Sequence, residues 1–254
     1  MTTSQQSETA DDRLGRLYNL ITGDEDARVC KDIPSESCND QPRNFFAYLG
    51  ANTLNKVADE MSSAKLVLPW MLGALGAPTV FTGFLVPIRE AGVLLPQMAV
   101  AALVRHLPRR QPVWLLGALL SALALFGMAA AALLLDGAAA GRATVTLLVV
   151  FRLARGLCSV SAKDVLGKTV SKSRRGRLMG WSAAAGGVLT LALGVWLAGM
   201  AGQDGGRELF AWLLGGAGLL WLAALLLFGG IREQPGATAG GGNALQVAID
   251  NLRL

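Results

Sequence analysis

The sequence predicts an all-α polytopic membrane protein with about six transmembrane helices. Hydrophobic residues make up 52% of its 254 residues and charged residues only 16%, whereas an ordinary soluble domain carries about 25% charged residues. Several apolar runs reach the length of about 20 residues that lets a helix cross a bilayer. Acidic residues gather at the front, where residues 1–65 hold 11 Asp and Glu against 7 Lys and Arg.

Residues 1–50 are expected to form a polar cytoplasmic tail that is partly disordered, because their composition supplies little apolar surface to bury. Leu14, Leu17, Leu20 and Ile21 have helical spacing, which predicts an amphipathic patch that rests on a membrane or on the protein itself. Asn44–Gly50 contains three aromatic residues and is interpreted as an interfacial lead-in to the first span.

The first ten residues lack the apolar core of a secretory signal, so the first helix is expected to direct insertion. With the front end in the cytoplasm, Cys30 and Cys38 are expected to stay reduced.

Residues 51–232 are expected to form the six-helix transmembrane bundle. Leu66–Ile88 is free of charge and long enough to be one span, which would leave Ala91–Val104 too short to cross again. The favoured alternative places a turn at Gly73, Gly76 and Pro78. It divides the region into two helices, Ala51–Leu75 and Thr79–Val104.

Four further spans are predicted from the remaining apolar runs: Val113–Leu135, Ala143–Lys168, Leu178–Ala201 and Leu209–Gly230. Residues 233–254 are expected to be a flexible linker followed by the start of a cytoplasmic amphipathic helix. Basic residues crowd the junctions after the second and fourth spans, which predicts that both ends of the bundle lie in the cytoplasm.

Charged and polar residues within or beside the predicted spans are the candidate substrate and ion cavity, because such residues mark transport pathways. They are Asp59, Glu60, Lys65, Arg89, Glu90, Gln97 and Arg152. Arg152 is the strongest candidate, with snorkelling or a fixed ion pair as the alternative.

Asp59 and Glu60 are candidates for proton or cation coupling, or else they begin an interfacial helix in which Lys56 is their partner. Arg89 is a candidate for binding an anionic substrate, and the adjacent Glu90 points to another side of the helix.

Other chemistries find little support. One histidine and three cysteines provide no metal-binding spacing and no Cys/His nucleophile pair. We therefore expect no metal, no cofactor and no catalytic residues, and hence no enzyme. The basic residues flank apolar segments, where they orient helices, so nucleic acid is not an expected partner.

The fourth span and the loop after it resemble the N-terminal half of a major facilitator superfamily transporter. Leu148, Arg152 and Gly156 match the pattern of that family's fourth helix, and small residues follow from Cys158. Arg175, Gly176 and Arg177 match its basic-glycine-basic turn before the fifth helix.

The resemblance implies a gate on the cytoplasmic side, formed here by Arg105, Arg109, Arg110, Asp164, Arg175, Gly176 and Arg177. Arg105 stands where the family usually carries an aspartate, so a pair between Arg105 and Asp164 would have its signs exchanged. The fifth span lacks the glycine-proline pair of antiporters, which favours symport or uniport.

The function implied is secondary active transport of a small solute by alternating access, in the cytoplasmic (inner) membrane of a bacterium. The expected partners are the lipid bilayer, the solute, a coupled proton or cation, and a second six-helix half. That half is either a C-terminal part of the same protein or another subunit. The alternative is a nontransporting six-helix scaffold or sensor whose cytoplasmic tail binds a partner.

Overall fold

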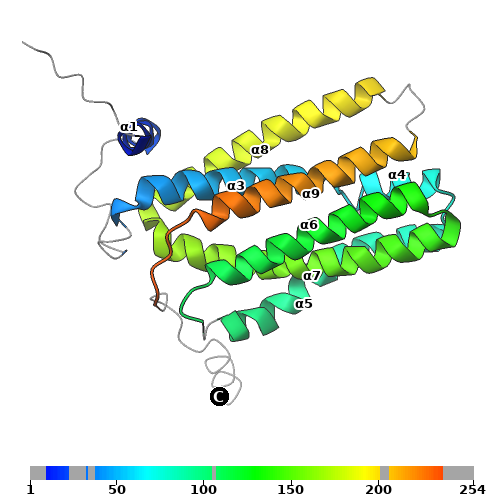
Figure 1. Ribbon diagram of the computed structural model, residues 1–254, viewed down its shortest axis with the longest axis horizontal. Coiled ribbons are helices and arrows are strands. Elements are labelled where there is room, and N and C mark those ends of the chain that lie inside the picture. The colour runs from blue at the N-terminus through cyan, green and yellow to red at the C-terminus, as the bar shows by residue number, and fades with distance from the viewer. Residues whose placement is uncertain (1–9, 23–32, 34–37, 105–106, 201–205, 237–254) are drawn as a thin grey trace, which may run out of the picture.

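A computed structural model describes residues 10–22, 33, 38–104, 107–200 and 206–236, and every regular element within these ranges is an α-helix. The long helices run side by side along the longest axis of the molecule, while α1 lies at one end of them (Figure 1). The helices are α1 (Ala10–Thr22), α3 (Gln41–Met61), α4 (Val67–Ala74), α5 (Thr79–Val104), α6 (Gln111–Leu134), α7 (Gly137–Thr169), α8 (Lys172–Met200) and α9 (Arg207–Gly229).

Four helices in the described part of the chain, α6 to α9, are long and apolar enough to cross a membrane. This number is lower than the six spans predicted. The difference lies in the first segment: α3 carries Lys56, Asp59 and Glu60 near its end, and α4 has only eight residues. The side chains of α5 are described only as far as Gly92.

The single helix predicted over Ala51–Leu75 is in fact two helices, and the first begins ten residues earlier, at Gln41. The predicted interfacial lead-in lies inside α3, where Phe45 and Tyr48 are buried. The break follows Met61. The Ser62 hydroxyl donates to the carbonyl of Ala58 at 2.8 Å, and such bonds compete with helix continuation.

The predicted turn before Pro78 is confirmed. Gly76 has φ +65°, a backbone conformation that glycine adopts without steric cost. The next helix, α5, spans Thr79–Val104 as expected. The α6–α7 turn joins the same end of the bundle, because the backbone N–H of Gly137 donates to the carbonyl of Leu75 at 2.8 Å.

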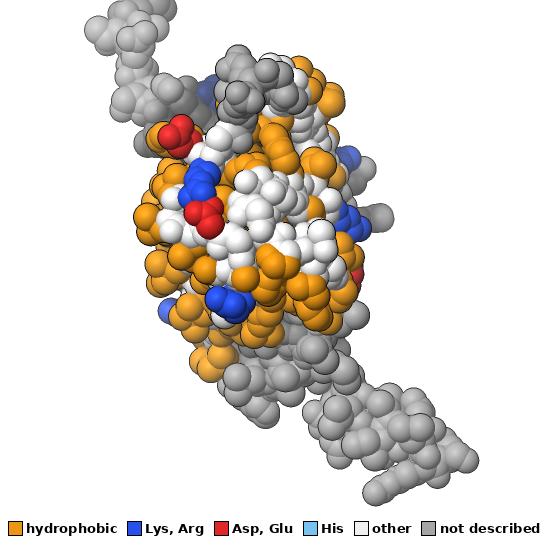
Figure 2. Space-filling view, turned by 90° about the vertical axis from the view of Figure 1, so that its right-hand side faces the viewer, with side chains coloured by type: hydrophobic (Ala, Val, Ile, Leu, Met, Phe, Trp, Pro, Cys, Tyr) orange, Lys and Arg blue, Asp and Glu red, His pale blue; other side chains and the backbone are white. Residues whose placement is uncertain are grey.

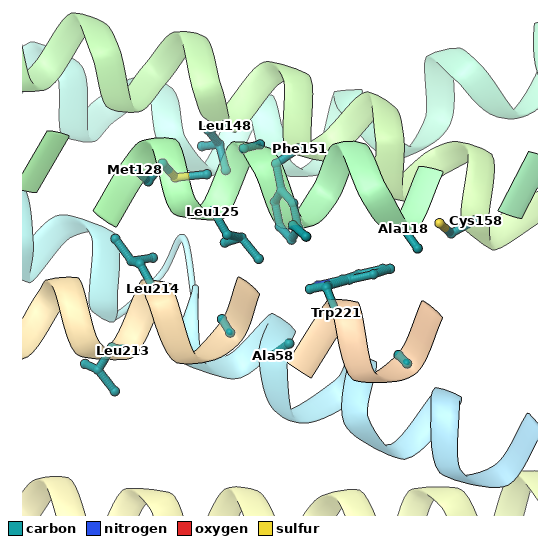
Figure 3. Packing of buried hydrophobic residues seen from close by; sticks show 14 of the residues in the cluster. Ala58, Ala118, Leu125, Met128, Leu148, Phe151, Cys158, Leu213, Leu214 and Trp221 are labelled. Carbon is teal, nitrogen blue, oxygen red and sulfur yellow. The ribbon is translucent and has the colours of Figure 1, made fainter. Parts of the chain in front are cut away.

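The apolar core lies where α6, α7 and α9 meet. Trp114 stacks on Phe228 with ring centroids 3.8 Å apart, and Trp221 meets Phe151 edge-on at 6.2 Å. Figure 3 shows Trp221 and Phe151 pointing toward one another. Gly117 permits this close packing, because a Cβ there would lie 2.7 Å from the sulfur of Cys158.

Charge divides the two ends of the bundle. One end, here called the basic end, holds the starts of α3, α6 and α8 and the ends of α7 and α9 (Figure 1). Its basic residues include Arg110, Lys168, Lys172, Arg174, Arg175 and Arg232. Figure 2 shows the opposite end, where charged side chains are few among apolar ones. Arg207 pairs with Asp136 there.

The predicted amphipathic patch is a helix, α1, and it rests on the bundle. Tyr18 packs edge-on against Phe45 with centroids 5.4 Å apart. Arg174 lies 4.7 Å over the ring of Tyr18 and donates to the hydroxyl of Thr22. Leu17 and Leu20 stay exposed, so the inner face of α1 contacts protein and its outer face does not.

The expectation of reduced cysteines is wrong for Cys38, which is disulfide-bonded. The expectation followed from a cytoplasmic location, where disulfides are rare, so this disulfide is an observation against that location for the start of α3. Cys30 lies outside the described residues, as do the predicted linker beyond Gly236 and the amphipathic helix after it.

Candidate functional site

A cluster of charged side chains forms halfway along α7, where that helix meets α3 and α5. We call it the arginine cluster and define it as Asp59, Arg89, Glu90, Arg152 and Arg155. Arg152 is 15 residues from the start of α7, which at 1.5 Å per residue is about 22 Å along the helix. The cluster therefore lies at mid-depth of a helix long enough to cross a bilayer.

Asp59 and Arg155 form the ion pair of the cluster. The Nε of Arg155 lies 3.0 Å from Oδ2 of Asp59, and the two side chains are 23% and 24% exposed. The guanidinium of Arg155 also lies 5.4 Å from the ring centre of Trp221, an arrangement that favours a cation over the ring face. Asp59 thus has a cationic partner on α7 rather than Lys56 of its own helix.

Sequence reasoning did not include Arg155 among the site residues. Its position three residues after Arg152 placed it on a neighbouring part of the same helix face, and that spacing was the available signal. The sequence does not show which helix places a carboxylate beside Arg155.

Arg152 is more deeply buried than its neighbour, with 5% of its surface exposed. Its Nε is buried and has no hydrogen-bond partner among the described residues. Its electrostatic neighbours are Asp59, Arg89, Arg155 and Glu90. The snorkelling alternative does not describe this side chain, because snorkelling carries a charge out to water.

A glycine on α5 brings that helix against Arg152. A Cβ at Gly92 would lie 2.6 Å from the Cβ of Arg152, so only glycine fits this crossing without movement. Arg89 is three residues before Gly92 and therefore on the same face of α5. This crossing is what joins Arg89 to the residues of α7.

The other predicted cavity residues are not drawn into the cluster to the same degree. Glu60 and Lys65 are exposed and are not members of the cluster, whereas Glu90 belongs to it and is exposed on α5. Gln97 lies on α5, but its side chain is outside the described residues.

A second charged site lies at the basic end, around the start of α6. The Nε of Arg110 is 3.3 Å from Oδ2 of Asp164, with Arg110 only 3% exposed and Asp164 32% exposed. The predicted partner of Asp164, Arg105, lies outside the described residues. Among the described residues, Asp164 pairs with Arg110, which follows Arg105 by five residues.

Glu233, which sequence reasoning missed, joins α9 to α6 and α7 at this end. Its side chain is fully buried, and its carboxylate accepts from Nζ of Lys168 at 2.9 Å. The backbone N–H groups of Arg110 and Gln111 donate to the same carboxylate at 2.8 and 2.7 Å. A carboxylate at these positions satisfies the free N–H groups that begin a helix.

Gln111, at the start of α6, in turn caps the end of α9. Its side-chain amide donates to the carbonyls of Phe228, Gly229 and Ile231 at 2.9–3.0 Å. The start of α6 and the end of α9 are therefore locked to one another by reciprocal caps.

The remaining predicted gate residues differ in their contacts. Arg175 donates to the carbonyls of Val170 and Gly167 at 2.9 and 2.8 Å, so it caps the end of α7. Arg109 and Arg177 are exposed, and a Cβ on Gly176 would meet nothing within 4 Å.

The two sites consist of charged side chains and are suited to binding charged groups. Within the described ranges, no three His, Cys, Asp or Glu side chains lie close enough together to hold a metal ion. The arginine cluster offers guanidinium donors and two carboxylates, Asp59 and Glu90, around the middle of α7. The basic end offers ion pairs that link three helices.

Comparison with known proteins does not assign the chain: no family model, curated protein or solved structure matches it. The fold and the site therefore define the class by themselves. The described residues form an all-helical bundle in which four apolar helices are compatible with an integral membrane protein.

Proposed function

We propose that the chain moves a small solute across a membrane by alternating access, as the N-terminal six-helix half of a transporter of the major facilitator type. The observation that carries the proposal is the arginine cluster at mid-depth of α7. Ionisable groups at membrane depth are costly and mark solute or ion pathways. The Asp59–Arg155 pair and the buried Arg152 are such groups.

Six crossings result if α3 and α4 together make the first and α5 makes the second. Helices α3 and α4 contain 21 and 8 residues, which end to end extend about 43 Å and exceed the roughly 30 Å hydrocarbon core of a bilayer. The polar residues of α3 are tolerated there because several of them face protein: Asn44 and Asn55 are buried, and Asp59 is paired.

Loop charge supports an orientation with the basic end in the cytoplasm. The basic end carries clustered Lys and Arg in short loops, and such loops stay on the cytoplasmic side. Both ends of the six-helix body, at the start of α3 and the end of α9, lie at this same end (Figure 1). The setting that we propose is a bacterial inner membrane.

The face of α8 supports the need for a second half. Gly180, Gly187 and Gly194 recur every seven residues, and a Cβ on any of them would meet nothing within 4 Å. Small residues at such spacing let helices of a membrane protein approach closely. In a complete transporter, a second six-helix half covers this face and encloses the arginine cluster between the halves.

A nontransporting scaffold or sensor is the second candidate, and α1 is the observation that favours it. This helix lies on the outside of the bundle, and its Leu17 and Leu20 are exposed. Exposed apolar side chains of this kind are suited to binding a protein partner. The transport proposal differs from it in requiring that the arginine cluster be reached from both sides of the membrane.

Thiol accessibility in full-length protein reconstituted in liposomes separates the two candidates. In a background without natural cysteines, Glu90→Cys should react with a membrane-impermeant reagent from either face, because alternating access opens the cluster to each side in turn. The control, Ala139→Cys at the opposite end from the basic loops, should react from one face only. Reaction at position 90 from one face alone, or from neither, contradicts alternating access and supports the scaffold.

A further inference from the structure

We propose that the arginine cluster binds an oxyanion group of the solute, a carboxylate or a phosphate, with Arg152 as the residue that contacts it. This inference rests on the proposed transport function and adds the chemical class of the substrate. It starts from the observation that Arg152, unlike Arg155, forms no ion pair with a carboxylate within the part of the chain that the structure describes.

The ion pair of the cluster already uses Asp59. Its Oδ2 lies 3.0 Å from Arg155, whereas Arg152 has a buried Nε without a hydrogen-bond partner among the described residues. A buried charge without a hydrogen-bonded partner is costly. The ring of Phe151, 5.1 Å from the Arg152 guanidinium, offsets only part of this cost. An arriving anion would offset more of it.

The charge of the cluster has the sign that an anion needs. Three arginines, Arg89, Arg152 and Arg155, face two carboxylates, Asp59 and Glu90, which leaves one positive charge. A monoanion would neutralise it. The guanidinium group presents paired N–H donors that match the two oxygens of a carboxylate or phosphate.

The open side of the cluster is where such an anion can enter. Arg155 and Asp59 keep about a quarter of their side-chain surfaces exposed, whereas Arg152 is 5% exposed. The pairing of Arg155 with Asp59 leaves Arg155 less available to an anion than Arg152. Arg89 approaches the same point from α5 through the glycine crossing at Gly92.

The test is binding to purified full-length protein, measured by isothermal titration calorimetry. The probes are lactate for a carboxylate, inorganic phosphate for a phosphate, glucose for a neutral solute and choline for a cation. Lactate or phosphate should bind saturably. The probe that binds identifies the oxyanion as a carboxylate or a phosphate. Arg152→Gln should raise its Kd by about tenfold or more, the loss expected for a charge-assisted hydrogen bond, and Arg152→Lys should raise it less. The matched control is Arg142→Gln, which changes an exposed arginine near the start of α7 and should leave the Kd unchanged.

Thermal unfolding without ligand gives an independent reading. Arg152→Gln should raise the Tm of the empty protein, because it removes an unpartnered buried charge. If Arg152 instead had a structural partner, the same change would lower the Tm. A lowered Tm with an unchanged Kd overturns the inference, as does the absence of saturable binding by both lactate and phosphate.

The outcomes also separate this inference from the proposed function. Anion binding that depends on Arg152, without uptake of the same anion into liposomes, supports the binding site and overturns transport. Uptake of glucose or choline that Arg152→Gln does not alter supports transport and overturns the oxyanion site.

Discussion

Glu233 is a buried carboxylate that links the end of α9 to the start of α6 and the end of α7. Glu233→Gln removes its charge and keeps its shape. The change leaves Lys168, whose side chain is only 7% exposed, without an anion. It also weakens the acceptor for the N–H groups of Arg110 and Gln111. Removing one partner of a buried pair costs about 3–5 kcal/mol.

Thermal unfolding of the purified protein in detergent measures this cost. For a chain of this length, each kcal/mol lowers the Tm by about 2–4 °C, so Glu233→Gln should lower it by roughly 6–20 °C. Adding Lys168→Met should recover part of the loss, because the unpaired ammonium is then gone.

The neighbouring Arg232→Gln is the matched control for this prediction. Arg232 pairs with Asp40, but its side chain is 59% exposed, and such pairs contribute less than about 1 kcal/mol. The Tm of this variant should therefore fall by less than about 4 °C. Equal losses for Glu233→Gln and Arg232→Gln would show that the buried network does not stabilise the fold as argued.

Three further predictions test the orientation, the pair at the basic end and the core. In a cysteine-free background, an impermeant thiol reagent added outside should label Ala139→Cys and not Ser173→Cys; labelling of position 173 alone would reverse the orientation. Arg110→Asp and Asp164→Arg should each reduce transport by the full-length protein, since the pair contributes about 1 kcal/mol or more. The double exchange should restore part of the uptake at equal expression, and additive losses would argue against a direct pair. Gly117→Ala should destabilise the protein by about 1–3 kcal/mol in a denaturation experiment, because its Cβ would lie 2.8 Å from a backbone oxygen of α7; an unchanged midpoint would contradict the close packing.

The sequence predicts the strongly apolar helices α6 to α9 better than it predicts the more polar helix α3. The predicted ranges of α6 and α9 lie within two residues of the observed ends, whereas α7 and α8 each begin six residues earlier than predicted. The turn before α5 is found because Gly76 and Pro78 are strong breakers. The break after Met61 is missed because it depends on Ser62 bonding to its own helix, and no apolar pattern reports that bond.

Some site residues are likewise predicted from the sequence, and others are not. Arg152 is predicted from one sequence alone, since a charge within an apolar run is conspicuous. Its neighbour Arg155 gains its importance from Asp59, which is 96 positions away, and Glu233 gains its role from residues more than 60 positions before it. Long-range partners are decided by how helices pack, and neither spacing nor composition contains that information.

The failure of α3 as an apolar span follows from its position in the bundle. A helix surrounded by lipid must be apolar around its circumference, but α3 packs against α8 and α9 and directs polar groups toward them. Asn52 donates to the hydroxyl of Ser182 on α8 at 2.8 Å, and Asn44 donates to the carbonyl of Arg232 after α9. A helix that packs against other helices on two sides can therefore carry polar residues that a helix surrounded by lipid cannot. The same freedom admits Asp59, so the helix that departs most from the hydropathy pattern is also the one that supplies the carboxylate of the arginine cluster.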